Sequence, residues 1–189
     1  MSKLTQKAIL KTFDDMIREM PFEKITITAL VARCEISSNT FYYHYQDIYD
    51  LLDQWLDMKL SKYQEDITLK GDWKSVLKKM LHNYQANPNI VNHVFRSIPR
   101  ERMENFLFHI LENDIFSLMK QQAKDLQLSE EALRTFAGVF YYSLCGFILK
   151  FIYEDMTADI DETFDPVIDF LDISFINYAK LNAARNFEP

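Results

Sequence analysis

Six neighbouring side chains, each with a polar group, could form hydrogen bonds to a nucleic acid; they are Ser38, Asn39, Thr40, Tyr42, Tyr43 and His44. An asparagine carries a donor and an acceptor that can pair with the edge of an adenine. Tyrosine and histidine donors suit phosphate oxygens. The short side chains come first and the longer ones follow, which suits a helix whose N-terminal residues reach base edges.

The surrounding residues predict two short helices with a three-residue break between them. Thr26 is the predicted N-cap of a helix over 27–34, and Ser37 is the predicted N-cap of a helix over 38–44. The apolar residues that could form the angle between these helices are Leu30, Val31, Cys34, Ile36 and Phe41. This pattern predicts a helix-turn-helix. The spacing alone also fits one more helical hairpin in a bundle, with its tyrosines at the edge of the core.

Residues 26–52 resemble the DNA-binding signature of the tetracycline-repressor (TetR) family. The match comprises a Thr before an apolar-rich helix, a turn that ends in Ile-Ser, the pattern Thr-x-Tyr-x-His-aromatic, a polar link and Leu-Leu. These residues are Thr26, Leu30, Ala32, Ile36, Ser37, Thr40, Tyr42, His44, Tyr45, Leu51 and Leu52. The stretch Thr40–Leu52 is especially similar to the subgroup of dihydroxyacetone-kinase-linked regulators.

The resemblance implies a homodimer that binds double-stranded DNA and dimerises through its last two long helices. It places the DNA contacts at Thr26, Thr28, Ser38, Asn39, Thr40, Tyr42, Tyr43 and His44, and it places Phe41 in the core. Two residues depart from the family pattern. Glu35 stands in the turn where the family has Gly, and Asp47-Ile48 stands where a Lys is common. Both departures predict a weaker electrostatic attraction to DNA.

Composition predicts an all-α chain with a large core. The chain has 189 residues, only 3 Gly and 5 Pro, and 48% hydrophobic residues, so long helices fit better than sheets, which need more turns. The net charge of -7 is unevenly spread, because residues 1–46 hold six basic and five acidic side chains. The acidity therefore belongs to the C-terminal part, and the N-terminal part can bind DNA only if its few cations cluster.

Hydrophobic periodicity predicts about nine helices, with domains at 1–47 for DNA binding and 48–189 for ligand binding and dimerisation. The expected helices cover 5–20, 27–34, 38–44, 47–70, 72–86, 89–97, 99–124, 129–154 and 165–184. Asp47, Asp72 and Ser129 are predicted to begin helices, and the prolines at 88, 99 and 166 are expected at or near helix starts.

The last two long helices carry more apolar surface than one core needs. One stripe holds Phe164, Val167, Ile168, Leu171, Phe175 and Tyr178, and a second holds Phe170, Ile173 and Ile176. Two apolar stripes need two partners, which a second copy of the chain or a wholly internal burial could supply. Gly138, Ser143 and Gly146 would let a neighbouring helix come close.

A small-molecule effector is expected in the C-terminal part, with walls that mix apolar and polar groups. The candidate residues are Tyr84, Phe95, Phe106, His109, Asn113, Tyr142 and Cys145. The alternative is that most of them are ordinary core residues. The arginines of Arg96–Arg102 are expected to pair with the nearby Glu101 and Glu104 at a solvated helix junction.

Enzyme, metal and membrane functions have little support. The histidines have no metal-ligand spacing, and neither a nucleophile motif nor a Gly-rich phosphate loop is present, so no cofactor is expected. The two cysteines, Cys34 and Cys145, lie in apolar stretches and predict buried free thiols of a cytoplasmic protein, with a disulfide as the alternative. No signal peptide is visible, and the uncharged run 136–149 is shorter than a membrane span.

The sequence therefore predicts a dimeric repressor controlled by a small ligand. The alternative is a family member that acts mainly through a partner protein and binds DNA weakly or without sequence preference.

Overall fold

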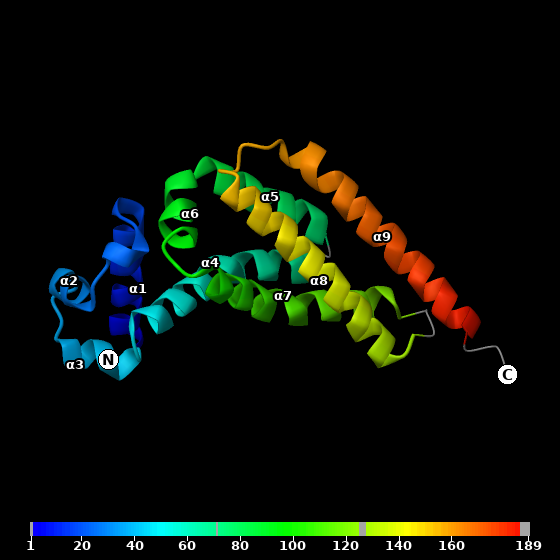
Figure 1. Ribbon diagram of the computed structural model, residues 1–189. Coiled ribbons are helices and arrows are strands. Elements are labelled where there is room, and N and C mark those ends of the chain that lie inside the picture. The colour runs from blue at the N-terminus through cyan, green and yellow to red at the C-terminus, as the bar shows by residue number, and fades with distance from the viewer. Residues whose placement is uncertain (1, 71, 125–127, 186–189) are drawn as a thin grey trace.

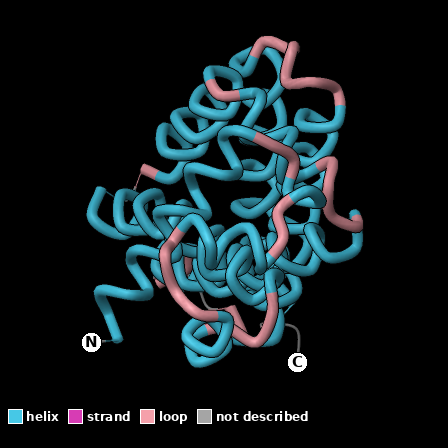
Figure 2. Tube along the Cα trace, turned by 90° about the vertical axis from the view of Figure 1, so that its left-hand side faces the viewer, coloured by secondary structure: helices cyan, strands magenta, loops and turns pink. Residues whose placement is uncertain are grey.

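A computed structural model describes residues 2–70, 72–124 and 128–185, with side chains described except at 2, 68–70, 109–111, 113, 114 and 182–185. Every regular element in these ranges is a helix (Figure 1). The helices are α1 (Ser2–Glu19), the 3-10 helix η1 (Phe22–Lys24), α2 (Ile27–Arg33), α3 (Ser38–His44), α4 (Ile48–Lys70), α5 (Trp73–Ala86), α6 (Pro88–Phe95), α7 (Arg100–Gln122), α8 (Glu130–Tyr153) and α9 (Ile160–Arg185). Short loops join them (Figure 2). The prediction of an all-α fold is confirmed, and η1 was not predicted.

Polar side chains begin the helices where the sequence predicts them. The side chains of Thr26, Ser37, Asp47, Asp72 and Ser129 each accept a hydrogen bond from a backbone N–H two or three residues later, at 2.7–3.2 Å. Each bond satisfies one of the N–H groups that the first turn of a helix leaves without a partner. The predicted starts of α2, α3, α4, α5 and α8 are thus confirmed.

The predicted start of the last helix is wrong. The helix begins at Ile160, and Pro166 lies inside it rather than at its start. The cap is Asp159, whose side-chain oxygen accepts from the N–H of Glu162 at 2.9 Å, while its carbonyl accepts from Thr163. A capped first turn and the burial of Ile160 and Phe164 outweigh the hydrogen bond that proline cannot donate.

The helices form a small N-terminal head, a connecting helix and a larger body (Figure 1). We call α1 to α3 the head and α5 to α9 the body. The long helix α4 begins against the head and runs into the body, where it packs against α5. In the body, α7 and α8 pack along each other, and α9 covers α8 and α5. The head meets the body mainly through α1 and α6.

The centre of the body is α8. Its buried residues include Phe140, Leu144, Cys145 and Ile148. By length and composition this helix could cross a membrane, but more than half of its most apolar window is buried inside the protein. Burial raises the pKa of the Cys145 thiol to about 12. Both thiols are free, as predicted, but the predicted burial is wrong for Cys34, which is half-buried at the end of the short helix α2.

Asp14 joins the head to the connecting helix. Its carboxylate accepts hydrogen bonds from the Trp55 indole at 2.9 Å and from Arg18 at 3.1 Å, and it lies 2.6 Å from the Lys59 ammonium. Partial burial raises the pKa of Asp14, but the bonds from Lys59 and Trp55 outweigh this effect and hold the pKa below its ordinary 3.8. Beside this contact, the ring of Phe13 packs edge-on against Trp55, with ring centres 6.1 Å apart.

We expect Asp14→Asn to lower the free energy of unfolding at pH 7 by on the order of 1–2 kcal/mol, because the variant loses the charge in these bonds. The pKa of Asp14 is lower in the folded state than in the unfolded chain. Its stabilisation is therefore fully present above pH 3.8 and is lost as the pH falls through the folded pKa. Urea unfolding at several pH values tests this. The difference between variant and wild type should shrink towards pH 3, and Asp57→Asn, an exposed change on α4, should show no such trend.

The turn between α2 and α3 has the geometry that usually requires glycine. The N–H of Ile36 bonds to the Val31 carbonyl at 3.0 Å, and the N–H of Glu35 bonds to the Ala32 carbonyl at 3.2 Å. Together these bonds form a Schellman motif, which places the residue directly after the C-cap of the helix in the left-handed region. Glu35 occupies this position with φ 56°. The expected departure from glycine therefore carries a conformational cost of about 1–2 kcal/mol.

We expect Glu35→Gly to raise the free energy of unfolding by about 1 kcal/mol, since the relief of strain exceeds the entropy that glycine adds to the unfolded chain. For a chain of this length, the melting temperature would rise by about 2–4 °C. The control is Ala32→Gly, at an exposed position within α2, which should lower stability. Equal losses in the two variants would contradict the assigned strain.

Candidate nucleic-acid interface

Helix α3 presents a polar and aromatic face to solvent and packs against the protein core through one aromatic residue. Tyr42 is 56% exposed and Tyr43 is 79% exposed, while Phe41 is fully buried. The ring of Phe41 lies 5.5 Å from that of the buried Tyr45, which fixes the C-terminal end of the helix. The placement of Phe41 in the core, which the resemblance implied, is confirmed.

The other predicted contact residues surround this face. Ser38 and Asn39 are exposed in the first turn of α3, and Thr40 and His44 are half-buried. The Thr40 hydroxyl lies 2.9 Å from that of Ser37 and so supports the cap. On α2, Thr26 is the exposed N-cap and Thr28 is exposed one residue into the helix. Six of the eight candidates are thus exposed, on two successive helices.

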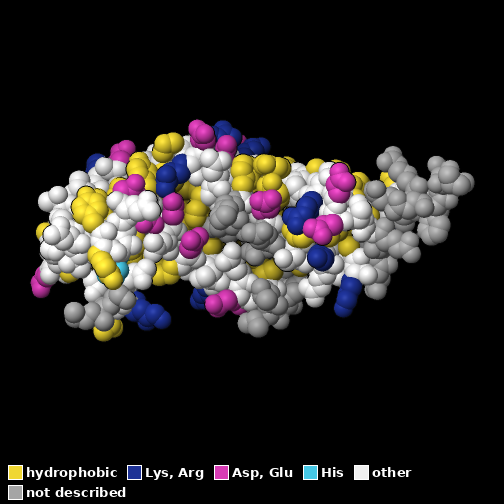
Figure 3. Space-filling view, turned by 90° about the horizontal axis from the view of Figure 1, so that it is seen from below, with side chains coloured by type: hydrophobic (Ala, Val, Ile, Leu, Met, Phe, Trp, Pro, Cys, Tyr) yellow, Lys and Arg dark blue, Asp and Glu magenta, His cyan; other side chains and the backbone are white. Residues whose placement is uncertain are grey.

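Ion pairs within the head occupy both of its arginines. Arg33 binds Glu19 through two nitrogens at 2.5 and 2.6 Å, and this hydrogen bonding holds the pKa of the Glu19 carboxyl below its usual range. Arg18 binds Asp14. Seen from below, basic and acidic side chains are interspersed along the molecule and do not gather into one basic patch (Figure 3). The free cations of the head must therefore be lysines.

Three lysines on α1 are a feature that the contact prediction missed. Lys3, Lys7 and Lys11 follow one another at intervals of four, so they share one face of the helix. All three are exposed, and none forms an ion pair with a described residue. The N-terminal half of α1 lies beside the start of α4, because Gln6 donates to Gln54 at 3.0 Å. The four-residue spacing of these lysines is the signal in the sequence that could have identified this basic face.

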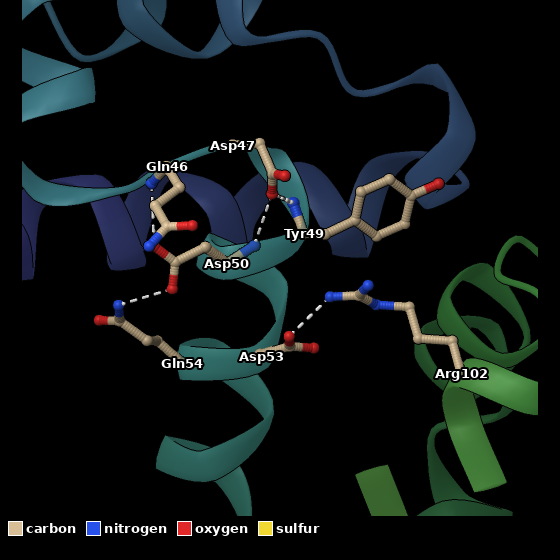
Figure 4. A network of polar contacts seen from close by, with 7 residues as sticks. All are labelled: Gln46, Asp47, Tyr49, Asp50, Asp53, Gln54 and Arg102. Atoms are coloured by element: carbon tan, nitrogen blue, oxygen red, sulfur yellow. Dashed lines mark hydrogen bonds and ion pairs between the residues drawn. The ribbon is translucent and has the colours of Figure 1, made fainter. Parts of the chain in front are cut away.

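The first turns of α4 connect the end of α3 to the body (Figure 4). The Asp47 carboxylate accepts from the N–H groups of Tyr49 and Asp50, and the Asp50 carboxylate accepts from the backbone of Gln46 and the side chain of Gln54. Asp47 stands in the region where the resemblance implies a lysine, so this helix start adds negative charge beside the candidate surface.

Arg102 links the same segment to α7. It donates to Asp53 at 2.6 Å, and its guanidinium lies 4.5 Å from the ring centre of Tyr49 (Figure 4). The expected local pairing of the arginines in Arg96–Arg102 is correct only for Arg100, which binds Glu104 at 2.6 Å.

The other two arginines of this segment bind carboxylates far along the chain. Arg102 pairs across to α4, and Arg96 binds Asp155 in the loop after α8 at 2.5 Å. Tertiary packing brings these carboxylates within reach, which sequence proximity alone does not indicate.

The candidate pocket residues fall into three groups. Tyr84, Phe95 and Phe106 line a cavity of about 310 Å³ between α1, α4, α5, α6 and α7. Tyr142 lies 56% exposed on α8, with its ring centre 4.7 Å from that of Phe108, and Cys145 is fully buried. Neither lines this cavity. The side chains of His109 and Asn113 lie outside the described residues.

The outer face of the last two helices is apolar and exposed. Phe170, Ile173 and Ile176 on α9 are 51–68% exposed, and Val139 on α8 is 56% exposed. A Cβ atom added at Gly146 would meet nothing within 4 Å. The first predicted stripe of α9 faces inward, where Phe164, Ile168, Leu171 and Phe175 are buried. The second stripe is left without a partner in the single chain.

No group of three or more described His, Cys, Asp or Glu side chains could hold a metal ion.

Among known proteins, a TetR C-terminal family model with the description "Transcriptional regulator C-terminal region" matches residues 71–172. No curated protein matches the chain.

A solved structure, "Dihydroxyacetone kinase operon activator DhaS", is similar in fold. It has a TM-score of 0.67 and 18% sequence identity, and the match covers 92% of this chain and 97% of that one. The family match spans more than half of the chain, and the structural match extends over both head and body. The chain therefore belongs to the TetR family of transcriptional regulators.

Proposed function

We propose that this regulator is a homodimer that binds a pseudo-palindromic DNA duplex through α3 and represses transcription under the control of a small ligand. Residues 1–47 would contact DNA, and residues 48–189 would bind the ligand and form the dimer, in the cytoplasm. The observation that carries the proposal is the exposed face of α3, where Asn39, Tyr42 and Tyr43 project beside a buried Phe41. No catalytic role is proposed for any residue.

The exposed α3 side chains suit different parts of a duplex. Ser38 and Asn39, in the first turn, are short enough to reach base edges in the major groove. Tyr42, Tyr43 and His44 follow and would donate to phosphate oxygens. Lys3 and Lys7 would add phosphate contacts from α1, and they are exposed cations without an ion pair among the described residues. The eight predicted contact residues, with these two lysines, form the proposed surface.

Dimerisation would place two copies of α3 on successive half-sites. The exposed stripe of Phe170, Ile173 and Ile176, together with the open surface at Gly146, is suited to a self-complementary contact around a two-fold axis. A single short helix such as α3 binds DNA weakly, and two-fold symmetry doubles the number of contacts with the duplex.

A second candidate is an activator that works through a partner protein. The name of the solved relative describes an operon activator. The head of this chain has few free cations, and Glu35 and Asp47 add negative charge beside the candidate surface. Binding that falls steeply with salt but ignores DNA sequence, together with a specific protein complex, would favour this candidate.

Selection of bound duplexes from a random pool tests the main proposal. We expect an enriched inverted repeat with half-sites about 34–36 Å, or a multiple of one helical turn, apart. A folded dimer that enriches no sequence would contradict sequence-specific binding and favour the second candidate.

Variants assign the contacts on the selected duplex. Asn39→Ala should relax the preference at one base pair by about 1–3 kcal/mol, whereas Tyr42→Ala with His44→Ala should weaken binding to all sequences by about tenfold or more. Lys3→Ala with Lys7→Ala should reduce the slope of log affinity against log salt by about two. The control is His82→Ala, an exposed histidine on α5, which should change none of these quantities.

The dimer face can be tested without DNA. We expect Ile173→Glu to weaken the dimer by on the order of 3 kcal/mol or more, because each dimer would bury two carboxylates. Analytical ultracentrifugation measures the change. Met58→Glu, an exposed apolar residue on α4 that is 43% exposed, is the matched control and should leave the dimer intact. A monomeric wild type, or an unchanged Ile173→Glu dimer, would show that this face is not the interface.

A further inference from the structure

The cavity between the head and the body has cations at its edge. Among the residues that line it are Arg18 of α1 and both Lys59 and Lys62 of α4, and none of its lining residues is acidic. Arg18 is 50% exposed and Lys59 is 38% exposed at the side chain, and Lys62 is exposed, so the three charges lie towards solvent. A cavity whose charged side chains are all basic is unusual in a chain with a net charge of -7. A site whose charged lining residues are all cations favours an anion.

The inner part of the cavity is apolar. Phe95 and Leu107 are each 6% exposed and form part of its wall. Both also line a second, smaller space of about 80 Å³ that reaches Trp73, Phe140 and Leu144 in the core of the body. The two spaces share Tyr84 as well, and burial raises the pKa of its hydroxyl well above the ordinary value, so the hydroxyl is neutral. A ligand that fits this arrangement has a charged end and an apolar chain.

Two of the three edge cations are already held by Asp14. Lys59 lies 2.6 Å from the Asp14 carboxylate, and Arg18 donates to its other oxygen at 3.1 Å. Lys62 forms no ion pair with a described residue. An anion entering beside Lys62 would approach the same two cations that bind Asp14. Because Asp14 belongs to the head while Lys59 belongs to the connecting helix, this competition would act on the contact between them.

We propose that the cavity binds an amphipathic organic anion, such as a carboxylate with a medium-length alkyl chain, whose charged group binds Lys62 and competes with Asp14 for Lys59 and Arg18. The alkyl chain lies along Phe95 and Leu107. The ligand class deepens the proposed function of ligand control, but the binding itself does not depend on DNA.

Calorimetric titration of the DNA-free protein tests the proposal with three probes of equal chain length: octanoate, 1-octanol and octylamine. We expect octanoate to bind at least about tenfold more tightly than 1-octanol, because hydrogen bonds to a charged group contribute on that order. Octylamine should bind most weakly, since its charge repels the three cations. Equal affinities for octanoate and 1-octanol would overturn the proposal, even though the apolar cavity would then bind both.

Substitutions separate the charge contact from the competition. Lys62→Met should weaken octanoate binding by about tenfold and leave 1-octanol binding unchanged, while Lys150→Met, at an exposed lysine on α8, should change neither affinity.

The Asp14→Asn variant should bind octanoate more tightly than the wild type, because Lys59 and Arg18 are then free of the carboxylate. The matched control is Asp53→Asn, which breaks the ion pair with Arg102 outside the cavity. An octanoate affinity that Asp14→Asn leaves unchanged or lowers would overturn the competition with Asp14. If the duplex selection showed no DNA binding, these titrations would still test the ligand proposal, because they use the DNA-free protein.

Discussion

The contact of Trp55 with α1 is the constraint on which the arrangement of the helices depends. The indole N–H binds Asp14, and the ring packs on Phe13, which in turn packs on Phe22 with ring centres 6.2 Å apart. A single aromatic residue on α4 therefore orients the first helix of the head and, through Phe22, the segment that leads into α2. Burial of Trp55 to 3% exposure makes this contact strong, and the polar bond to Asp14 makes it directional.

Much of the fold could be predicted because short-range signals decide where helices begin. Ser37 and Asp72 are side chains that cap, and the structure uses them in that way. Pro166 misled the prediction, because a proline near the start of a helical pattern has the same local signature whether the helix begins just before it or six residues earlier. The burial of Ile160 and Phe164 decides between the two, and burial depends on the rest of the fold.

The candidate site was less predictable than the fold. The exposed face of α3 followed from the positions of Phe41 and its neighbours, since one buried residue on a seven-residue helix fixes which side faces solvent. Tyr84, Phe95 and Phe106 were predicted to line a pocket, but its cationic edge did not follow, because Lys59 and Lys62 read as ordinary surface charges until α1 and α6 are placed against α4. Tyr142 was a reasonable candidate from its neighbours, but its side of α8 faces solvent. Residues from separate helices meet only through tertiary packing, which no local pattern records.

The length of α4 has a mechanical consequence. This helix has 23 residues and so is about 35 Å long, with its first turn following α3 and its later turns packed against α5 in the body. If it moves as a rigid rod, a tilt of only about 5° at the body end would displace the head end by about 3 Å over that length. In the proposed two-fold dimer the two copies of α4 would tilt in opposite directions, so the separation of the heads would change by about twice as much. A duplex has a fixed helical repeat, and a mismatch of that size is enough to lift one reading helix out of register with its half-site.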